Sequence, residues 1–166
     1  MKHLIRLLVL AALSLTLLAS CGGEPEIPED VDFAACLVTE NVGGMLTVTG
    51  TTELGKAQSV LVIPASIDGA PLKSIAEGAF DGCQKLKTIY INADSSIAYL
   101  NNGAFKGAIS LSRVVIGKKH SEITVGSGLM DGAASSAKIC VPAEYFADYT
   151  TDYQWGAFSS RIVKQS

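Results

Sequence analysis

The sequence predicts an α/β fold, namely a short solenoid of parallel strands with irregular or short helical returns, capped at both ends. Three observations lead to this prediction. One pattern of apolar residues and glycines occurs three times between residues 72 and 141, always 25 residues apart. Each copy ends in a short β-prone triplet, and the segments on both sides of the copies differ from them in composition. A single unit of this size cannot bury its own apolar side, so stacked copies have to share one core.

The three copies align without a gap. They run from Ile75 to Ile91, from Leu100 to Ile116 and from Val125 to Val141. A spacing of 25 residues lies within the range of roughly 20 to 29 residues that is typical of leucine-rich repeats, in which each unit supplies one strand and one return. The repeated positions in the first copy are Ile75, Gly78, Ala79, Phe80, Gly82, Cys83, Leu86, Ile89 and Ile91.

The strands are predicted at the triplets Ile89–Ile91, Val114–Ile116 and Ile139–Val141. In each triplet the outer two residues are apolar. Because side chains alternate along a strand, we expect the outer residues to point into the core and the middle residue to point out. An earlier triplet, Leu61–Ile63, lies 28 residues before the first one and predicts a further coil.

The returns carry a large apolar residue at one repeated position, occupied by Phe80, Phe105 and Met130. We expect these three side chains to form a ladder through the core. A glycine follows two residues later in every copy, where the chain is expected to need a positive φ or a close backbone approach at a turn. These glycines are Gly82, Gly107 and Gly132.

The pattern Ile-x-x-Gly-Ala-Phe-x-Gly-Cys-x-x-Leu-x-x-Ile-x-Ile, from Ile75 to Ile91, resembles the BspA-like (Treponema pallidum type) leucine-rich repeat of bacterial lipoproteins. The resemblance covers about Leu61 to Val141. The third copy departs from the pattern, since Met130, Ala133 and Ser136 stand where the family has Phe, Cys and Leu. The resemblance implies a role in protein binding, because members of this family are implicated in adhesion to host matrix proteins or to other bacteria.

Residues 1–20 predict a lipoprotein signal peptide. Lys2 and Arg6 precede the apolar run Leu7–Leu18, and small residues precede Cys21. The Leu-Ala-Ser-Cys ending resembles the bacterial lipobox, which implies that Cys21 carries lipid and attaches the chain to a membrane of the cell envelope.

Residues 21–32 predict an acidic flexible tether, in which Pro25 and Pro28 favour an extended chain. An acidic run after the lipidated cysteine resembles the export signal of surface lipoproteins, which implies an outer-membrane, surface-exposed location. Without residues 1–20 the chain holds 11 Lys and Arg against 16 Asp and Glu, a formal net charge of −5. This charge argues against a nucleic-acid partner.

The repeats at residues 61–141 are predicted to lie between two caps. Residues 33–60 form the N-terminal β cap, because the β-prone run Leu46–Thr49 follows two glycines. Residues 142–166 form the C-terminal cap, which begins with a short helix after Pro142.

Trp155 lies in the C-terminal cap, close to two other aromatic residues. We interpret it as a plug on the last coil. The alternative is a platform on which a sugar ring stacks.

No set of residues predicts catalysis, a metal site or a cofactor. His120 lies in a polar stretch that we interpret as a solvated loop, and nothing places a nucleophile beside it. Cys36, Cys83 and Cys140 lack the paired spacing of metal ligands. Cys83 is expected to be buried, and Cys140 occupies an outward strand position where it could be exposed. The sequence leaves open whether Cys36 and Cys83 form a disulfide.

The remaining candidate site is the outward face of the predicted strands. Repeat proteins commonly bind partners on such a face, and aromatic and Arg side chains are favoured anchors. A strand face that merely carries β-forming and solubilising residues would look the same. The middle row is Val62, Tyr90, Val115 and Cys140, flanked by Thr88, Arg113 and Lys138 on one side and Asn92 on the other.

We therefore expect a non-catalytic, lipid-anchored cell-surface module that binds host or bacterial surface proteins. One alternative is a glycan-binding accessory lipoprotein that uses Tyr90, Trp155 and nearby tyrosines. The other is a structural spacer of the cell envelope. The sequence makes no prediction of the oligomeric state.

Overall fold

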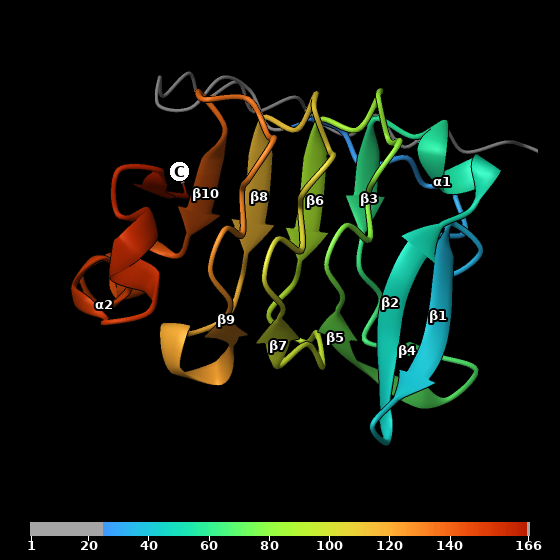
Figure 1. Ribbon diagram of the computed structural model, residues 1–166, viewed down its shortest axis with the longest axis horizontal. Helices are drawn as coiled ribbons and strands as arrows, with labels where there is room; N and C mark the ends of the chain where they lie inside the picture. Colours follow the sequence, from blue (N-terminus) through green and yellow to red (C-terminus); the bar gives the residue numbers. More distant parts are fainter. Residues whose placement is uncertain (1–24, 166) are drawn as a thin grey trace, which may run out of the picture.

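The computed structural model describes residues 25–165 (Figure 1). The predicted signal peptide, Cys21 and the first residues of the predicted tether lie outside this range. The described chain forms a mixed α/β structure with parallel strands in two sheets and a few short helices. Within residues 25–165 no helix has the length and apolar character that a membrane span requires.

The four predicted triplets lie in four strands of a five-stranded parallel sheet with the order β11-β10-β8-β6-β3, and the fifth strand, β11, comes from the C-terminal cap and was not predicted. Ile89 stands opposite Val114, and Val114 stands opposite Ile139, so the 25-residue spacing of the sequence becomes the register of the sheet. Leu61 stands opposite Ile89 and extends this sheet by one strand. The strands are β3 (Val60–Val62), β6 (Thr88–Ile91), β8 (Arg113–Ile116), β10 (Lys138–Val141) and β11 (Ile162–Lys164).

Short strands of the returns pair with the hairpin of the N-terminal cap in a second sheet, with the order β1-β2-β5-β7-β9 and with β4 paired to β5 (Figure 1). The prediction of irregular or helical returns was therefore wrong in part, since helical structure between the first and third copies is confined to η1 (His120–Glu122) in the part of the chain described. The strands are β1 (Leu37–Val42), β2 (Met45–Thr51), β4 (Ser66–Ile67), β5 (Ala70–Ile75), β7 (Tyr99–Leu100) and β9 (Thr124–Val125).

Stacking explains why such short segments become strands. The Asn101 amide donates to the Ile75 carbonyl at 3.0 Å, and the Gly126 amide donates to the Leu100 carbonyl at 2.7 Å. Each coil thus forms hydrogen bonds with backbone groups of the coil beside it. A strand of two residues could not satisfy its own backbone hydrogen-bonding groups without these neighbours.

One continuous core includes apolar side chains from both sheets and from the turns. The predicted ladder is confirmed: Phe80 and Phe105 are fully buried with ring centroids 5.8 Å apart, and Met130 is 4% exposed. The turn prediction is confirmed as well, because Gly82 and Gly107 have φ of +77° and +82°.

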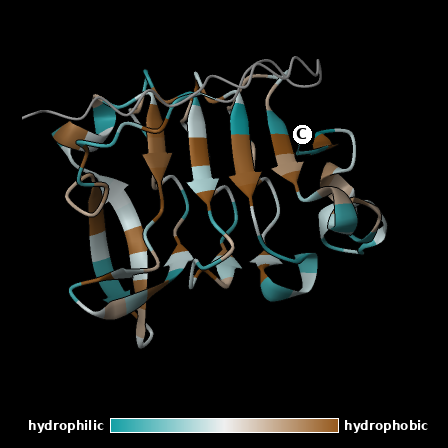
Figure 2. Ribbon diagram, turned by 180° about the vertical axis from the view of Figure 1, so that it is seen from behind, coloured by the Kyte–Doolittle hydropathy of each residue, from teal (hydrophilic) through white to brown (hydrophobic). Residues whose placement is uncertain are grey.

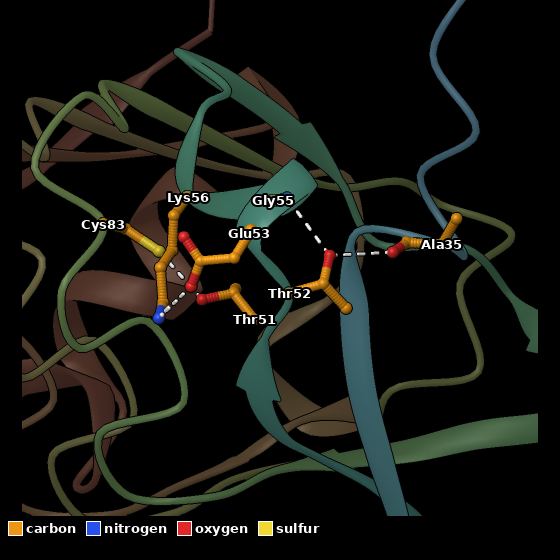
Figure 3. Close-up of polar contacts among 7 residues, drawn as sticks. All are labelled: Ala35, Thr51, Thr52, Glu53, Gly55, Lys56 and Cys83. Atoms are coloured by element: carbon orange, nitrogen blue, oxygen red, sulfur yellow. Dashed lines mark hydrogen bonds and ion pairs between the residues drawn. The ribbon is translucent and has the colours of Figure 1, made fainter.

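The N-terminal cap is the hairpin of β1 and β2, whose two-residue turn uses Gly43 and Gly44 at positive φ. The helix α1 (Glu53–Lys56) follows. Its N-cap is Thr52, whose hydroxyl oxygen accepts from the Gly55 amide at 3.3 Å and donates to the Ala35 carbonyl at 2.9 Å (Figure 3). This contact ties the segment before β1 to the start of the helix.

The C-terminal cap consists of η2 (Ala143–Tyr145), α2 (Phe146–Thr151), η3 (Trp155–Phe158) and β11. Trp155 has no exposed surface, and its Nε1 donates to the carbonyls of Ile123 at 3.2 Å and His120 at 3.3 Å. Its ring meets Tyr149 edge-on, with centroids 4.9 Å apart. The interpretation of Trp155 as a plug is confirmed, and a sugar platform at this residue is excluded by its burial.

Stability at alkaline pH is expected to depend on Tyr149. Its hydroxyl donates to the Lys118 carbonyl at 2.8 Å. Burial, with a smaller effect of the Glu122 charge, raises the pKa of Tyr149 well above its ordinary value. The unfolded chain loses this proton first, so the stabilisation is complete below about pH 10 and is lost as the pH rises further.

We expect Tyr149→Phe to remove this part of the alkaline slope and to cost about 1 kcal/mol below pH 10 through the lost hydrogen bond. Urea unfolding between pH 8 and 11 measures both effects. Tyr153→Phe is the control, because Tyr153 is 89% exposed. Equal slopes for wild type and Tyr149→Phe would contradict the assignment.

Candidate interaction surface

The residues of the predicted binding face do lie together on the five-stranded sheet. Thr88, Arg113 and Lys138 form one cross-strand row, and Tyr90 stands opposite Val115 in another. Asn92 follows the end of β6. Their role in binding stays a prediction.

The expected exposure of this face is wrong for its centre. Thr88 is 2% exposed, Tyr90 5% and Val115 8%. Arg113 and Lys138 are half-buried. Asn92 is exposed.

The outward row is apolar, and its side chains pack against one another. Its residues form a second, smaller cluster that is separate from the main core, and Figure 2 shows hydrophobic residues along these strands. Cys140, expected at a position where it could be exposed, belongs to this cluster and is 4% exposed. The buried members are Val60, Tyr90, Val115 and Cys140, with Val62 and Val163 packed against them.

The three cysteines of the described chain are buried and form no disulfide, so Cys36 and Cys83 are not bridged in this structure. The Cys83 Sγ lies 3.1 Å from the Thr51 hydroxyl (Figure 3). Burial raises the pKa of the Cys36 and Cys83 thiols. Because the thiolate is the reactive form, these cysteines are suited to packing and not to nucleophilic chemistry.

His120 was expected in a solvated loop, and this expectation is wrong. The residue is half-buried in η1, and its ring meets Tyr149 with centroids 6.0 Å apart. The cause is the C-terminal cap, which folds back over a segment about 30 residues earlier in the chain. Among residues 25–165 no three or more His, Cys, Asp or Glu side chains gather closely enough to hold a metal ion.

The outer face of the second sheet carries an exposed aromatic residue that the sequence analysis missed. Tyr99 begins β7 and pairs with Ser74 of β5 and Thr124 of β9. Its side chain is 41% exposed, whereas the next residue, Leu100, is 1% exposed and lies in the core. Alternation along the strand therefore turns Tyr99 outward.

An apolar hollow of about 510 Å³ lies on one side of Tyr99. The β1–β2 hairpin, the start of β5 and the residue before β7 supply its walls. Lys73 is the one charged residue among those that line it. The lining residues are Asn41, Gly44, Met45, Leu46, Ala70, Pro71, Lys73, Ala98 and Tyr99.

A second hollow of about 390 Å³ lies on the other side of Tyr99 and is more polar. Two asparagines line it, and both already bridge neighbouring coils. The Asn101 side chain donates to the Ser74 hydroxyl and to the Ile75 carbonyl, each at 2.9 Å, and the Asn102 side chain accepts from the Ser127 amide at 3.0 Å. The lining residues are Glu77, Tyr99, Leu100, Asn101, Asn102, Thr124, Val125 and Gly126.

Gly126 allows this close approach of coils. A Cβ atom at this position would lie 2.3 Å from the Asn102 side-chain oxygen and 2.4 Å from its backbone nitrogen. Neither hollow is lined by His, Cys or Ser. An exposed aromatic ring between an apolar and a polar hollow is suited to binding.

No protein-family profile matches the chain, and no curated protein matches it. Among solved structures, the chain is similar to the crystal structure of the T. pallidum leucine rich repeat protein TpLRR. The two are 17% identical, with a TM-score of 0.40, and the similarity covers 74% of this chain and 73% of that one. By its own structure, this chain belongs to the mixed α/β class with parallel strands.

Proposed function

We propose that this chain is a non-catalytic binding module of the leucine-rich-repeat type. It is anchored by lipid on Cys21, displayed on the bacterial surface, and binds host or bacterial surface proteins. The observation that carries the proposal is the parallel pairing of copies at a separation of 25 residues in both sheets. Stacked repeats of this kind form extended surfaces, which such proteins use for partners.

The exposed surface favours a binding role over a spacer. Tyr99 and the two hollows beside it lie on the outer face of the second sheet, where an inert spacer has no need of an exposed aromatic ring. The glycan alternative relied on Tyr90, Trp155 and nearby tyrosines. One of these tyrosines, Tyr153, is 89% exposed, but the two residues that the alternative names, Tyr90 and Trp155, are 5% and 0% exposed. Neither ring offers a face for stacking on a sugar.

The tether sets the distance between the module and the membrane. Val31 and Phe33 pack against the core, so the folded unit begins near Val31. The chain from Cys21 to Val31 can span at most about 35 Å. An anchored module would therefore stay close to the membrane surface.

Protease treatment of intact cells tests the proposal. We expect the wild type to fractionate with membranes and to be cleaved in intact cells, and Cys21→Ala to appear in the soluble fraction. Cys140→Ala is the matched control, since it removes a different cysteine and should keep the anchor. Protection of the wild type until the outer membrane is opened would contradict surface display.

Binding is tested in the same strains. Cells with the anchored wild type should attach to immobilised matrix proteins or to other bacteria more than cells that lack the protein. Equal attachment of both strains to all surfaces would contradict the binding role.

A further inference from the structure

We propose that the apolar hollow beside Tyr99 binds one large apolar side chain of an extended peptide segment with acidic neighbouring residues. The inference rests on the proposed protein-binding function. It names the part of the surface that holds the partner and the chemistry of that partner.

The walls of the hollow define the first requirement. Met45, Leu46 and Pro71 contribute apolar residues to the lining, and Tyr99 adds an aromatic one. A volume of about 510 Å³ lies within the range of roughly 300 to 1,000 Å³ that is usual for ligand pockets. Met45 is half-buried, and methionine adapts readily to the shape of an incoming group. A large aliphatic or aromatic side chain meets this requirement.

Lys73 defines the second requirement. It is the one charged residue of the lining, and it is half-buried. The two ion pairs within residues 25–165 join Lys56 to Glu53 and Lys106 to Glu77, so neither uses Lys73. A carboxylate beside the inserted side chain would complement the positive charge of Lys73. The same charge would disfavour peptides with basic residues at this position, so the site would be specific for acidic segments.

The polar groups argue for a peptide and against a sugar. The lining of the apolar hollow is mostly non-polar, with polar side chains from Asn41, Lys73 and Tyr99, so it suits an apolar side chain better than a sugar covered with hydroxyl groups. In the neighbouring hollow, Asn101 and Asn102 already bond to adjacent coils. A short extended segment fits the site, because side chains alternate along an extended chain. One apolar side chain can enter the apolar hollow, while the backbone or a polar side chain of the same segment lies over the polar hollow.

Selection from a phage-displayed library of random heptapeptides tests the proposal. The target is the full chain with Cys21→Ala, which is purified without lipid. We expect enriched peptides to combine a large apolar residue with Asp or Glu one or two positions away. Tyr99→Ser and Met45→Glu should each weaken the binding of a selected peptide at least tenfold.

A charge reversal gives the sharpest readout. Selection on Lys73→Glu should enrich Lys or Arg in place of Asp and Glu beside the same apolar residue. Tyr153→Ser and Lys85→Glu are matched controls at exposed positions outside the hollow, and we expect peptide affinity to change by less than twofold. Circular dichroism of each variant verifies that it is folded.

Several outcomes would overturn the inference. It fails if no peptide is enriched, if selected peptides bind Tyr99→Ser as well as wild type, or if Lys73→Glu selects the same charges. Binding to a glycan array that is lost in Tyr99→Ser would assign the site to carbohydrate. If the protein is displayed on the surface and Tyr99→Ser attaches to proteins as well as the wild type does, the proposed function stands. The hollow is then excluded as the binding site.

Discussion

Replacing Trp155 by alanine is expected to lower the free energy of unfolding by about 3 to 5 kcal/mol. The side chain has no exposed surface and closes the end of the core, where it packs on Tyr149 and Phe158. Its removal opens a cavity and exposes the last coil to water. Urea unfolding followed by circular dichroism measures the effect, since the chain has a single tryptophan and the variant loses that fluorescence signal.

Trp155→Phe separates packing from hydrogen bonding. This variant keeps most of the apolar surface but loses the Nε1 donor to the carbonyls of His120 and Ile123. We expect a smaller loss of about 1 to 3 kcal/mol. A loss below 1 kcal/mol for Trp155→Ala would show that the C-terminal cap contributes little to the stability of the repeats.

Phe105→Ala is expected to cost about 3 to 5 kcal/mol as well. Phe105 is fully buried in the middle copy, with Phe80 at the same position of the first copy and Met130 at that of the third. A cavity here interrupts the core between coils, and it has little room to collapse because the backbone is tied on both sides. The Phe105 amide donates to the Leu129 carbonyl at 3.1 Å. Denaturant unfolding measures the loss.

Ile109→Ala is the matched control for this prediction. Ile109 lies in the same copy but is 58% exposed, so its truncation should change stability by less than about 0.5 kcal/mol. Combining Phe105→Ala with Phe80→Leu tests the ladder directly, because residues in contact give a coupling energy of about 0.5 kcal/mol or more. Strict additivity of the two losses would contradict a continuous ladder.

The sequence predicted the parts of the fold that depend on local pattern and on period. The apolar pairs at Ile89 and Ile91 and at their repeated positions predicted the strands, because a side chain must alternate between the two faces of a strand. The glycines at the turns predicted positive φ. Trp155, a large apolar residue beyond the last repeat, predicted the plug.

The second sheet, and with it the candidate site, was not predicted from the sequence. Pairs such as Tyr99 and Leu100 are too short to show alternation, and they become strands only because neighbouring coils satisfy their backbone groups. The 25-residue spacing of Ser74, Tyr99 and Thr124, each one residue before a core position, was the available signal. A search for outward positions in the returns would have found it.

By itself, the sequence determined the period, the register of the four repeated strands and the core residues at the repeated positions, because these follow from periodicity and from the burial of apolar groups. Only the tertiary structure decided which outward residues are exposed. Tyr90 and Tyr99 both alternate with core residues, yet Tyr90 packs in an apolar row and is 5% exposed, whereas Tyr99 stands between two hollows and is 41% exposed. Exposure depends on neighbours that are distant in sequence, and no local pattern contains that information.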